Sequence, residues 1–420
     1  MIEFFASIIV LFNLTIIPLV VIRRIYTHVP SAFLNPLLFL VVGSYGYMTL
    51  SSAFLFEYYV PGYNYNEQQR AVTDIYSNFY TLVFFLAYCL SKDSKHSKIT
   101  FCPLRLTTKL AFFFVAAISP IFIFLIAKNI NSAITNYTNR EISHLLWATD
   151  YEKYKVGTLN NIYMAAVSVL AWRKQNPKLF LFFLIPSIFP LMFNGKGDPL
   201  KFLIFAYINI VCINKKPYFV PVGLVVMTVF CTSIFRLRED YGIATILLGE
   251  FVGPRFSTDI VFYEMQGEGN IRELLTFPVY SLLPGKISSI ILPQHENYVS
   301  MLAQKINIGW HIMGSPLGEV LYYSGKIMAL VAPLVVAIIF FALNQMKLHR
   351  TLPGFIFLIF LGLHIHLMMR EGFFQHLLTI VYLMFSYLIW ITIPEGYLRR
   401  WKTGYNHRIG GPQKNLLSST

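Results

Sequence analysis

The chain consists largely of apolar runs about twenty residues long, the length that crosses a bilayer as a helix, separated by short polar segments. A transmembrane β-barrel would instead show roughly ten-residue segments of alternating polarity, and these runs do not alternate. Of the 420 residues, 56% are hydrophobic and only 13% are charged, which is more apolar sequence than a water-soluble domain uses. The sequence therefore predicts an all-α polytopic membrane protein.

We expect about eleven transmembrane helices. Their ranges are 2–22, 32–54, 72–90, 109–128, 156–172, 179–194, 200–214, 218–235, 317–344, 353–369 and 377–394. They divide the chain into an N-terminal bundle of about eight helices at 1–235, a large polar loop at 236–316, C-terminal transmembrane helices at 317–394 and a basic tail at 395–420. The loop is expected to be partly helical, and 298–313 is read as a short amphipathic helix that lies at the membrane surface or packs within the loop.

The distribution of charge predicts the orientation in the membrane. Six alternate segments, together with Lys109, contain 19 of the 34 Lys and Arg residues but only two acids, Asp93 and Glu395. These segments are 23–31, 91–108, 173–178, 215–217, 345–352 and 395–420. Because cytoplasmic loops carry the excess of positive charge, the N-terminus is predicted to be periplasmic and the C-terminus cytoplasmic. The net charge of +14 is thus an orientation signal and does not indicate nucleic-acid binding.

Several kinds of site are not indicated by the sequence. The four cysteines form no CxxC pair, so neither a disulfide framework nor a zinc site is predicted. Walker, GxSxG and HExxH motifs are absent, as is a DxD-like pair in an outer loop. We therefore expect no cofactor and no metal, with any anionic ligand held by arginine and lysine.

The outer side carries two arginines that are candidates for contact with phosphate. Arg370 stands at the outer end of a predicted span, where its guanidinium could grip phosphate with two donors, snorkel to headgroups or pair with Glu371. Arg255 follows Gly253-Pro254, read as a turn that presents its side chain. Glu319, just inside the next span, either pairs with Arg255 or Arg370 or acts as a general base; we favour the pairing.

Other outer residues are weaker candidates for substrate binding. Lys196 lies between two glycines that would let a ligand approach the backbone. The same pattern also fits a solvated loop lysine without a function. Arg236 and Arg238 stand beside two acids, which also suits a structural ion-pair cluster. Candidate general bases are His295, His311 and His376, and candidate sugar-stacking side chains include Trp310 and Tyr323. Cationic groups at a membrane rim suit a ligand with an anionic head and a lipid tail, such as a polyprenyl diphosphate sugar.

The layout resembles the Wzy-type O-antigen polymerases, which polymerise oligosaccharide repeat units for bacterial surface polysaccharides. The shared features are the number of spans, the NGKGDPLKFLIF turn, GPRF within the large loop, GSPLGEVLYYSG at the start of the next span and MMREGFF near the end. Members of this family often have arginine where Lys196 stands. The resemblance covers most of the chain as architecture.

This resemblance implies a metal-independent glycosyltransferase of the C superfamily in the bacterial inner membrane, acting in lipopolysaccharide biosynthesis. It would transfer a growing glycan from undecaprenyl diphosphate to an incoming lipid-linked repeat unit at the periplasmic face. By matched position, Arg255 and Arg370 would hold the diphosphate with Glu319 as their support. The implied partners are undecaprenyl-diphosphate-linked oligosaccharides and the lipid bilayer, with a chain-length regulator and a flippase of the same pathway as candidates.

Two alternatives remain open. An O-antigen ligase-type glycosyltransferase would use a histidine and arginines in the large loop, and His295 and His311 are consistent with it. A transporter or flippase of lipid-linked oligosaccharide would show paired halves or charges at the membrane midplane. We find no such repeat, and the predicted spans are nearly free of charge.

Overall fold

The computed structural model describes residues 1–28, 31–53, 65–91, 105–135, 146, 149–151, 153–154, 156–193, 197–214, 243–273, 298–306, 314–346, 348–373 and 376. For some of them, including Arg370 and Glu371, only the backbone is described. The regular structure in these ranges is entirely helical. The α-helices are α1 (Ile2–Thr27), α2 (Pro36–Ser44), α3 (Ser51–Ala53), α4 (Glu67–Leu90), α5 (Arg105–Thr135), α7 (Val156–Lys174), α8 (Leu184–Met192), α9 (Gly197–Asn214), α11 (Ile243–Glu264), α14 (Tyr298–Ile306), α15 (Pro316–Gln345) and α16 (Leu352–Glu371). The tighter or wider helical segments are η1 (Ser31–Leu34), η2 (Tyr45–Leu50), η3 (Pro177–Phe183) and η4 (Leu348–Arg350).

Long apolar helices confirm that this is a helical membrane protein. Among the described residues, four segments are long and apolar enough to cross a bilayer: Ile2–Thr27, Pro36–Ala53, Thr107–Thr135 and Pro316–Gln345. Their outward faces expose large apolar side chains such as Leu19, Phe112 and Ile338, as expected for surfaces that contact lipid. The predicted spans 218–235 and 377–394 lie outside the described residues. The count of eleven spans therefore stays a prediction.

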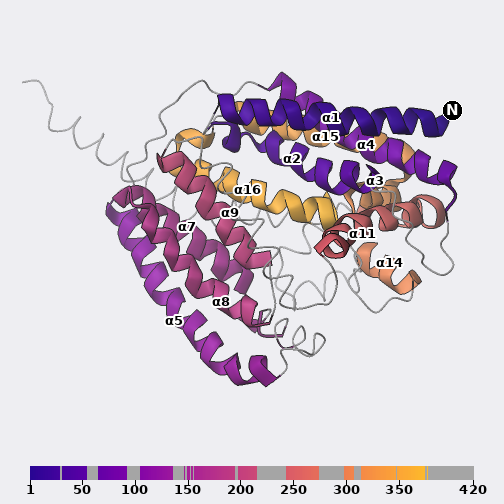
Figure 1. Cartoon of the computed structure of the whole chain (residues 1–420). Helices are drawn as coiled ribbons and strands as arrows, with labels where there is room; N and C mark the ends of the chain where they lie inside the picture. The colour runs from indigo at the N-terminus through magenta and orange to yellow at the C-terminus, as the bar shows by residue number, and fades with distance from the viewer. Residues whose placement is uncertain are drawn as a thin grey trace, which may run out of the picture.

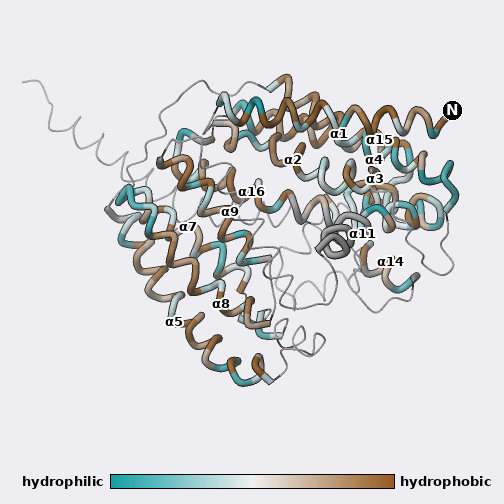
Figure 2. Tube along the Cα trace, viewed as in Figure 1, coloured by the Kyte–Doolittle hydropathy of each residue, from teal (hydrophilic) through white to brown (hydrophobic). Residues whose placement is uncertain are grey.

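The helices form two groups joined by α16 (Figure 1). In the first group α4 packs against α1, α2 and α15, and α11 packs against α15 and η2. In the second group α5 packs against α7 and α8, and α9 packs against α8, η3 and α7. α16 contacts α2 on one side and α9 on the other, which joins the groups. Apolar residues run along most of α1, and hydrophilic residues gather at the right-hand end of the view (Figure 2).

Capping side chains determine where four of these helices begin. The side chains of Asn35, Ser315 and Thr351 accept hydrogen bonds from backbone N–H groups in the first turns of α2, α15 and α16. A proline follows each cap within the first turn, where its missing N–H costs nothing. α4 begins with a reciprocal capping box between Asn66 and Gln69. These local signals explain why α15 and α16 begin within a residue of their predicted starts.

The predicted span 32–54 is interrupted. α2 ends at Ser44, and η2 continues the chain as a π-helical turn before the short α3. The hydroxyls of Ser51 and Ser52 both donate to the Met48 carbonyl, at 2.9 and 2.8 Å. Such back-bonding competes with the regular helical pattern, which gives a local reason for the interruption.

α15 is also broken, at Gly325, whose φ of 74° and ψ of −174° are not helical. A break leaves backbone carbonyls of the preceding turn without their usual partners. Two N–H groups from the segment after α11 bond to them: Gly267 N–H to Leu321 O and Gly269 N–H to Tyr322 O, both at 3.0 Å. The start of α15 is therefore held by the segment that follows α11.

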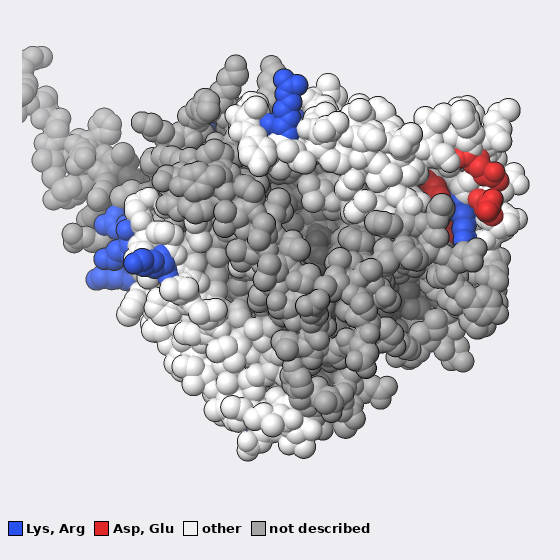
Figure 3. Space-filling view, in the orientation of Figure 1, with Lys and Arg blue, Asp and Glu red and all other residues white. Residues whose placement is uncertain are grey.

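Acidic and basic side chains are distributed unevenly between the two ends of the helices. Arg24 near the end of α1 donates to the carbonyls of Tyr88 and Ser91 and so caps the end of α4. At the other end, the beginnings of α1, α4 and α15 lie near α11 (Figure 1). On the visible face, described Asp and Glu lie at the right beside a patch of Lys or Arg, and the other described Lys and Arg lie at the left and top (Figure 3). The predicted periplasmic ends of α1, α4 and α15 lie together (Figure 1), while the direction in the membrane stays a prediction.

α14 covers part of the predicted amphipathic helix. It ends at Ile306, and 307–313 lies outside the described residues. Tyr298 and Leu302, on one face of α14, are fully buried, whereas Lys305 is exposed. The apolar face of α14 therefore packs within the protein, in agreement with the second of the two interpretations.

Candidate functional site

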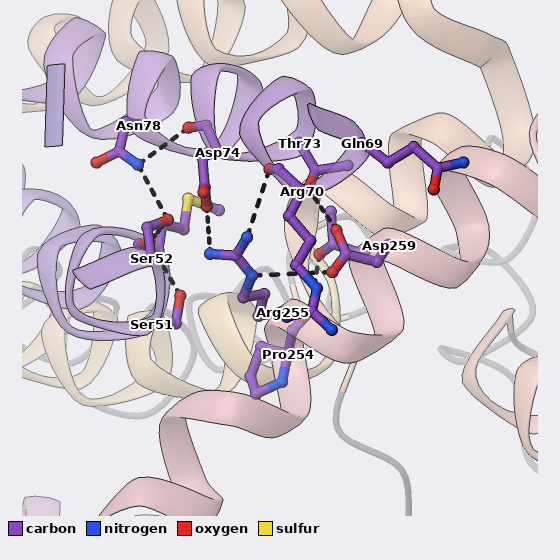
Figure 4. A network of polar contacts seen from close by, with 12 residues as sticks. Ser51, Ser52, Gln69, Arg70, Thr73, Asp74, Asn78, Pro254, Arg255 and Asp259 are labelled. Atoms are coloured by element: carbon purple, nitrogen blue, oxygen red, sulfur yellow. Dashed lines mark hydrogen bonds and ion pairs between the residues drawn. The ribbon is translucent and has the colours of Figure 1, made fainter. Parts of the chain in front are cut away.

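A polar stripe lies on the first turns of α4 and faces α11. Arg70, Thr73 and Asp74 are spaced three and four residues apart, so they share one side of the helix. Arg255 and Asp259 on α11 are likewise four residues apart. The two stripes meet in a network of hydrogen bonds and ion pairs (Figure 4).

Arg255 lies between two carboxylates. Its Nη1 forms an ion pair with Asp74 Oδ1, and its Nε lies 3.8 Å from Asp259 Oδ2. Its Nη2 donates to the Arg70 carbonyl at 3.4 Å. The side chains of Arg255 and Asp74 are only 11% and 15% exposed, so the pair is shielded from water. These contacts hold the guanidinium in a defined position.

The prediction of a turn before Arg255 was wrong. Gly253 and Pro254 lie inside α11, which runs without interruption from Ile243 to Glu264. The hydroxyls of Ser257 and Thr258 donate to the carbonyls of Gly253 and Pro254 at 3.0 and 2.8 Å. Pro254 withholds its N–H only from the carbonyl four residues earlier, and α11 continues on both sides of it.

Asp259 is the most buried acid of this network, with no exposed surface. Thr73 donates a hydrogen bond to Asp259 Oδ1, and Arg255 faces its other oxygen. One turn further along α11, the Tyr263 hydroxyl donates to the Gln69 carbonyl at 2.7 Å. Burying a carboxylate is costly unless it is paired and hydrogen-bonded, and both conditions are met. The contacts attach α11 firmly to the start of α4.

Buried amides and hydroxyls extend the network toward α1. Asn78 donates to Ser52 Oγ at 3.1 Å and to the Asp74 carbonyl at 2.9 Å. Asn13 on α1 donates to Asn78 Oδ1 at 3.0 Å. Interhelical hydrogen bonds of this kind stabilise the association of membrane helices, because the hydrophobic effect contributes little to helix packing inside a bilayer.

Glu319 lies in the first turn of α15 and is 2% exposed. Its carboxyl carbon and Oε1 would both be 2.9 Å from a Cβ at Gly372, the residue that follows α16. Gly372 has a φ of 137°, which side chains other than glycine rarely tolerate. The Glu319 carboxylate therefore lies against the backbone two residues beyond Arg370, one of the two cations predicted to pair with it. The other, Arg255, pairs with Asp74 and Asp259.

α11 and α15 are joined by hydroxyl groups. The Thr258 and Ser315 hydroxyls are 2.6 Å apart. Tyr298 of α14 uses its hydroxyl for both backbone groups of Ser315, accepting from the N–H and donating to the carbonyl at 2.9 Å. Ser315 also caps α15, so the helix that carries Glu319 is tied to the helix that carries Arg255.

Tyr323 lies in the same region, but its ring is packed inside the protein. It is 6% exposed and lies edge-on to Tyr322 with ring centroids 4.9 Å apart. A Cβ at Gly269 would be 2.6 Å from ring carbons of both tyrosines. A role for Tyr323 in stacking on sugars stays a prediction.

The remaining predicted residues lie mostly outside the described part of the chain. These are Lys196, Arg236, Arg238, Trp310, His295 and His311, together with the side chain of Arg370. Asp198, from the same turn as Lys196, is described. It accepts a hydrogen bond from Asn160 at 2.9 Å and pairs with Lys201 at 3.4 Å, so it joins the start of α9 to α7.

Asp74 and Asp259 were missed by the sequence analysis. Asp74 fell inside the predicted span 72–90, where an acidic residue is a signal of a functional or paired position. Its partner Arg255 is 181 residues away, so no local pattern predicts the contact.

Within the described ranges, no three His, Cys, Asp or Glu residues lie close enough to hold a metal ion. Comparisons with protein-family models, curated proteins and solved structures find no match.

Proposed function

We propose that the chain is a membrane glycosyltransferase that polymerises undecaprenyl-diphosphate-linked oligosaccharide repeat units, as O-antigen polymerases do. The reaction would take place at the periplasmic face of a bacterial inner membrane, with the N-terminus outside and the C-terminus inside. It would need no metal ion.

One observation carries this proposal: three of the segments behind the resemblance lie together at one end of the helices. GPRF lies in α11, GSPLGE at the start of α15 and MREGF at the end of α16. The contact between Thr258, two residues after GPRF, and Ser315 joins the helices of the first two, and that between Glu319 and Gly372 joins the last two.

The arrangement suits transfer from a diphosphate leaving group. Such a group departs readily, so the protein has to hold its phosphates, align the acceptor hydroxyl and take up one proton. Arg255 would contact phosphate through its guanidinium, a planar group that carries five N–H donors. Asp74 and Asp259 would act as positioning residues for that guanidinium. Glu319 would orient Arg370 or accept the proton from the hydroxyl.

Deleting the gene in its host and separating the lipopolysaccharide on a gel tests the activity. A polymerase predicts that each core carries a single repeat unit in the deletion strain. Bare core would identify a ligase instead, and an unaltered ladder would exclude both enzymes.

Arg370 gives a sharper test of diphosphate binding. Arg370→Ala should remove long chains while the protein stays in the membrane at normal abundance. Arg370→Lys should restore only part of the chain length, because an ammonium group cannot grip two oxygens at once. Full activity of the lysine variant would show that Arg370 is an interfacial anchor.

A further inference from the structure

An apolar groove lies between η3, α8 and α9, in the helical group away from the polar network. Its volume is about 510 Å³. Pro199, Phe202, Leu203, Ala206 and Ile210 line it from one face of α9. This face extends over the twelve residues from Pro199 to Ile210, or about 17 Å along a helix. The groove is therefore long and apolar, which is the shape that a hydrocarbon chain fills.

The opposite wall of the groove reaches the outer surface of the protein. Leu181 and Leu184 line it and are 66% and 62% exposed. Phe182 and Ile188, on the same segment, are also exposed. In a membrane protein these side chains contact lipid, so the groove is open to the hydrocarbon of the bilayer.

Positive charge marks one end of the groove. Lys178 is among its lining residues and is exposed. A tight turn follows α7, in which the Asn176 N–H bonds to the Ala171 carbonyl at 3.1 Å and the Asn176 side chain accepts from Lys178 N–H at 3.0 Å. The turn places Lys174, in the last turn of α7, close in the chain to Lys178.

We propose that this groove binds one acyl chain of an anionic phospholipid, whose phosphate lies against Lys174 and Lys178. Charge complementarity selects this occupant: the lining is apolar along its length and cationic at one end. Basic pockets between transmembrane helices bind anionic headgroups for the same reason. The site is separate from glycosyl transfer and does not depend on the function proposed above.

The test uses the full-length protein, delipidated in a neutral detergent. Phosphatidylglycerol or phosphatidylcholine with identical acyl chains is added, and bound lipid is measured by native mass spectrometry. Phosphatidylglycerol should bind at least tenfold more tightly. Lys178→Gln should weaken its binding about fivefold, the effect of one lysine near an anionic headgroup, and should leave phosphatidylcholine binding unchanged. Lys109→Gln, an exposed lysine on α5 outside the lining, is the matched control and should have no effect.

A second variant tests the groove itself. Ala206→Trp fills it from α9 and should remove the tight site for phosphatidylglycerol. If this variant does not fold, Lys178→Gln still decides, because that side chain is exposed and its replacement leaves the packing intact. Equal affinity for the two lipids, or no effect of Lys178→Gln, would overturn the proposal. Preferential binding of a polyprenyl phosphate over phosphatidylglycerol would also overturn it.

Discussion

At the scale of single residues, Arg255 combines a structural and a proposed chemical role, and the two can be separated. Arg255→Gln alone removes the cation that pairs with both Asp74 and Asp259. Removing one partner of a buried ion pair costs about 3–5 kcal/mol, so loss of activity in this variant could come from misfolding. The double variant Arg255→Gln/Asp74→Asn removes one positive and one negative charge, so the net charge of the cluster is unchanged and Asp259 keeps its hydrogen bond from Thr73.

We expect the double variant to be more abundant in the membrane than Arg255→Gln alone while long glycan chains stay absent. The loss of a contact to the departing diphosphate should lower the rate about a hundredfold. Abundance is measured by immunoblot and chain length by gel, with Asp74→Asn alone as the control. Recovery of long chains together with abundance would show that Arg255 is structural only.

Gly372 gives a second residue-scale prediction. Gly372→Ala should destabilise the protein for two reasons: its φ is unfavourable for alanine, and the new Cβ meets the Glu319 carboxyl group. Gly267→Ala is the matched control, since Gly267 has a φ of 73° and open space around a Cβ. Backbone strain of this kind costs about 1 kcal/mol or more. Gly372→Ala should lower the Tm in detergent by more than Gly267→Ala does, and equal losses would contradict the contact with Glu319.

At the scale of helices, the sequence predicted some boundaries closely and missed others. The start of α15 follows from Ser315-Pro316 and the start of α16 from Thr351 with its nearby proline, because caps act within one turn. The break at Gly325 could not be predicted in this way, since the N–H groups that compensate for it come from a segment more than fifty residues earlier. The contact of α11 with α4 likewise depends on partners far apart in the chain.

Asp150 attaches the short helical stretch at 149–151 to α5, and the strength of this attachment should depend on pH. Lys128 Nζ lies 2.8 Å from both carboxylate oxygens, and Asn129 donates to one of them at 2.8 Å. Burial raises the pKa of Asp150, but the hydrogen bonds from Lys128 and Asn129 outweigh this effect and bring the pKa below its ordinary value. The stabilisation is therefore present above the unfolded-state pKa of about 3.9 and is lost as the pH falls through the lower folded-state pKa.

Asp150→Asn should lower the stability at pH 7 by about 1 kcal/mol, a modest value because Lys128 is partly exposed. The difference in Tm between wild type and variant should shrink as the pH is lowered from 5 to 3. A Tm difference that stays constant over this pH range would show that the ionised carboxylate does not contribute to stability.

At the scale of the whole molecule, we predict that the polar network between α4 and α11 faces the periplasm. Gln266 is exposed in the segment after α11, whereas Arg350 is exposed between α15 and α16. In a variant without native cysteines, Gln266→Cys should react with a membrane-impermeant maleimide in intact spheroplasts, and Arg350→Cys only after permeabilisation. The reverse pattern would place the polar network on the cytoplasmic side and would end the proposal of periplasmic glycosyl transfer.

The break at Gly325 also sets how deep Glu319 lies relative to the bilayer. The twenty residues that follow Gly325 in α15 measure about 30 Å, which alone matches the thickness of the hydrocarbon layer. Large exposed apolar side chains begin on this helix at Ile327, while residues 316–323 are buried in protein. We therefore expect the turns that carry Glu319 to stand above the acyl chains, at the height of the lipid headgroups. A carboxylate at that level can contact a polar substrate without entering the hydrocarbon layer of the bilayer.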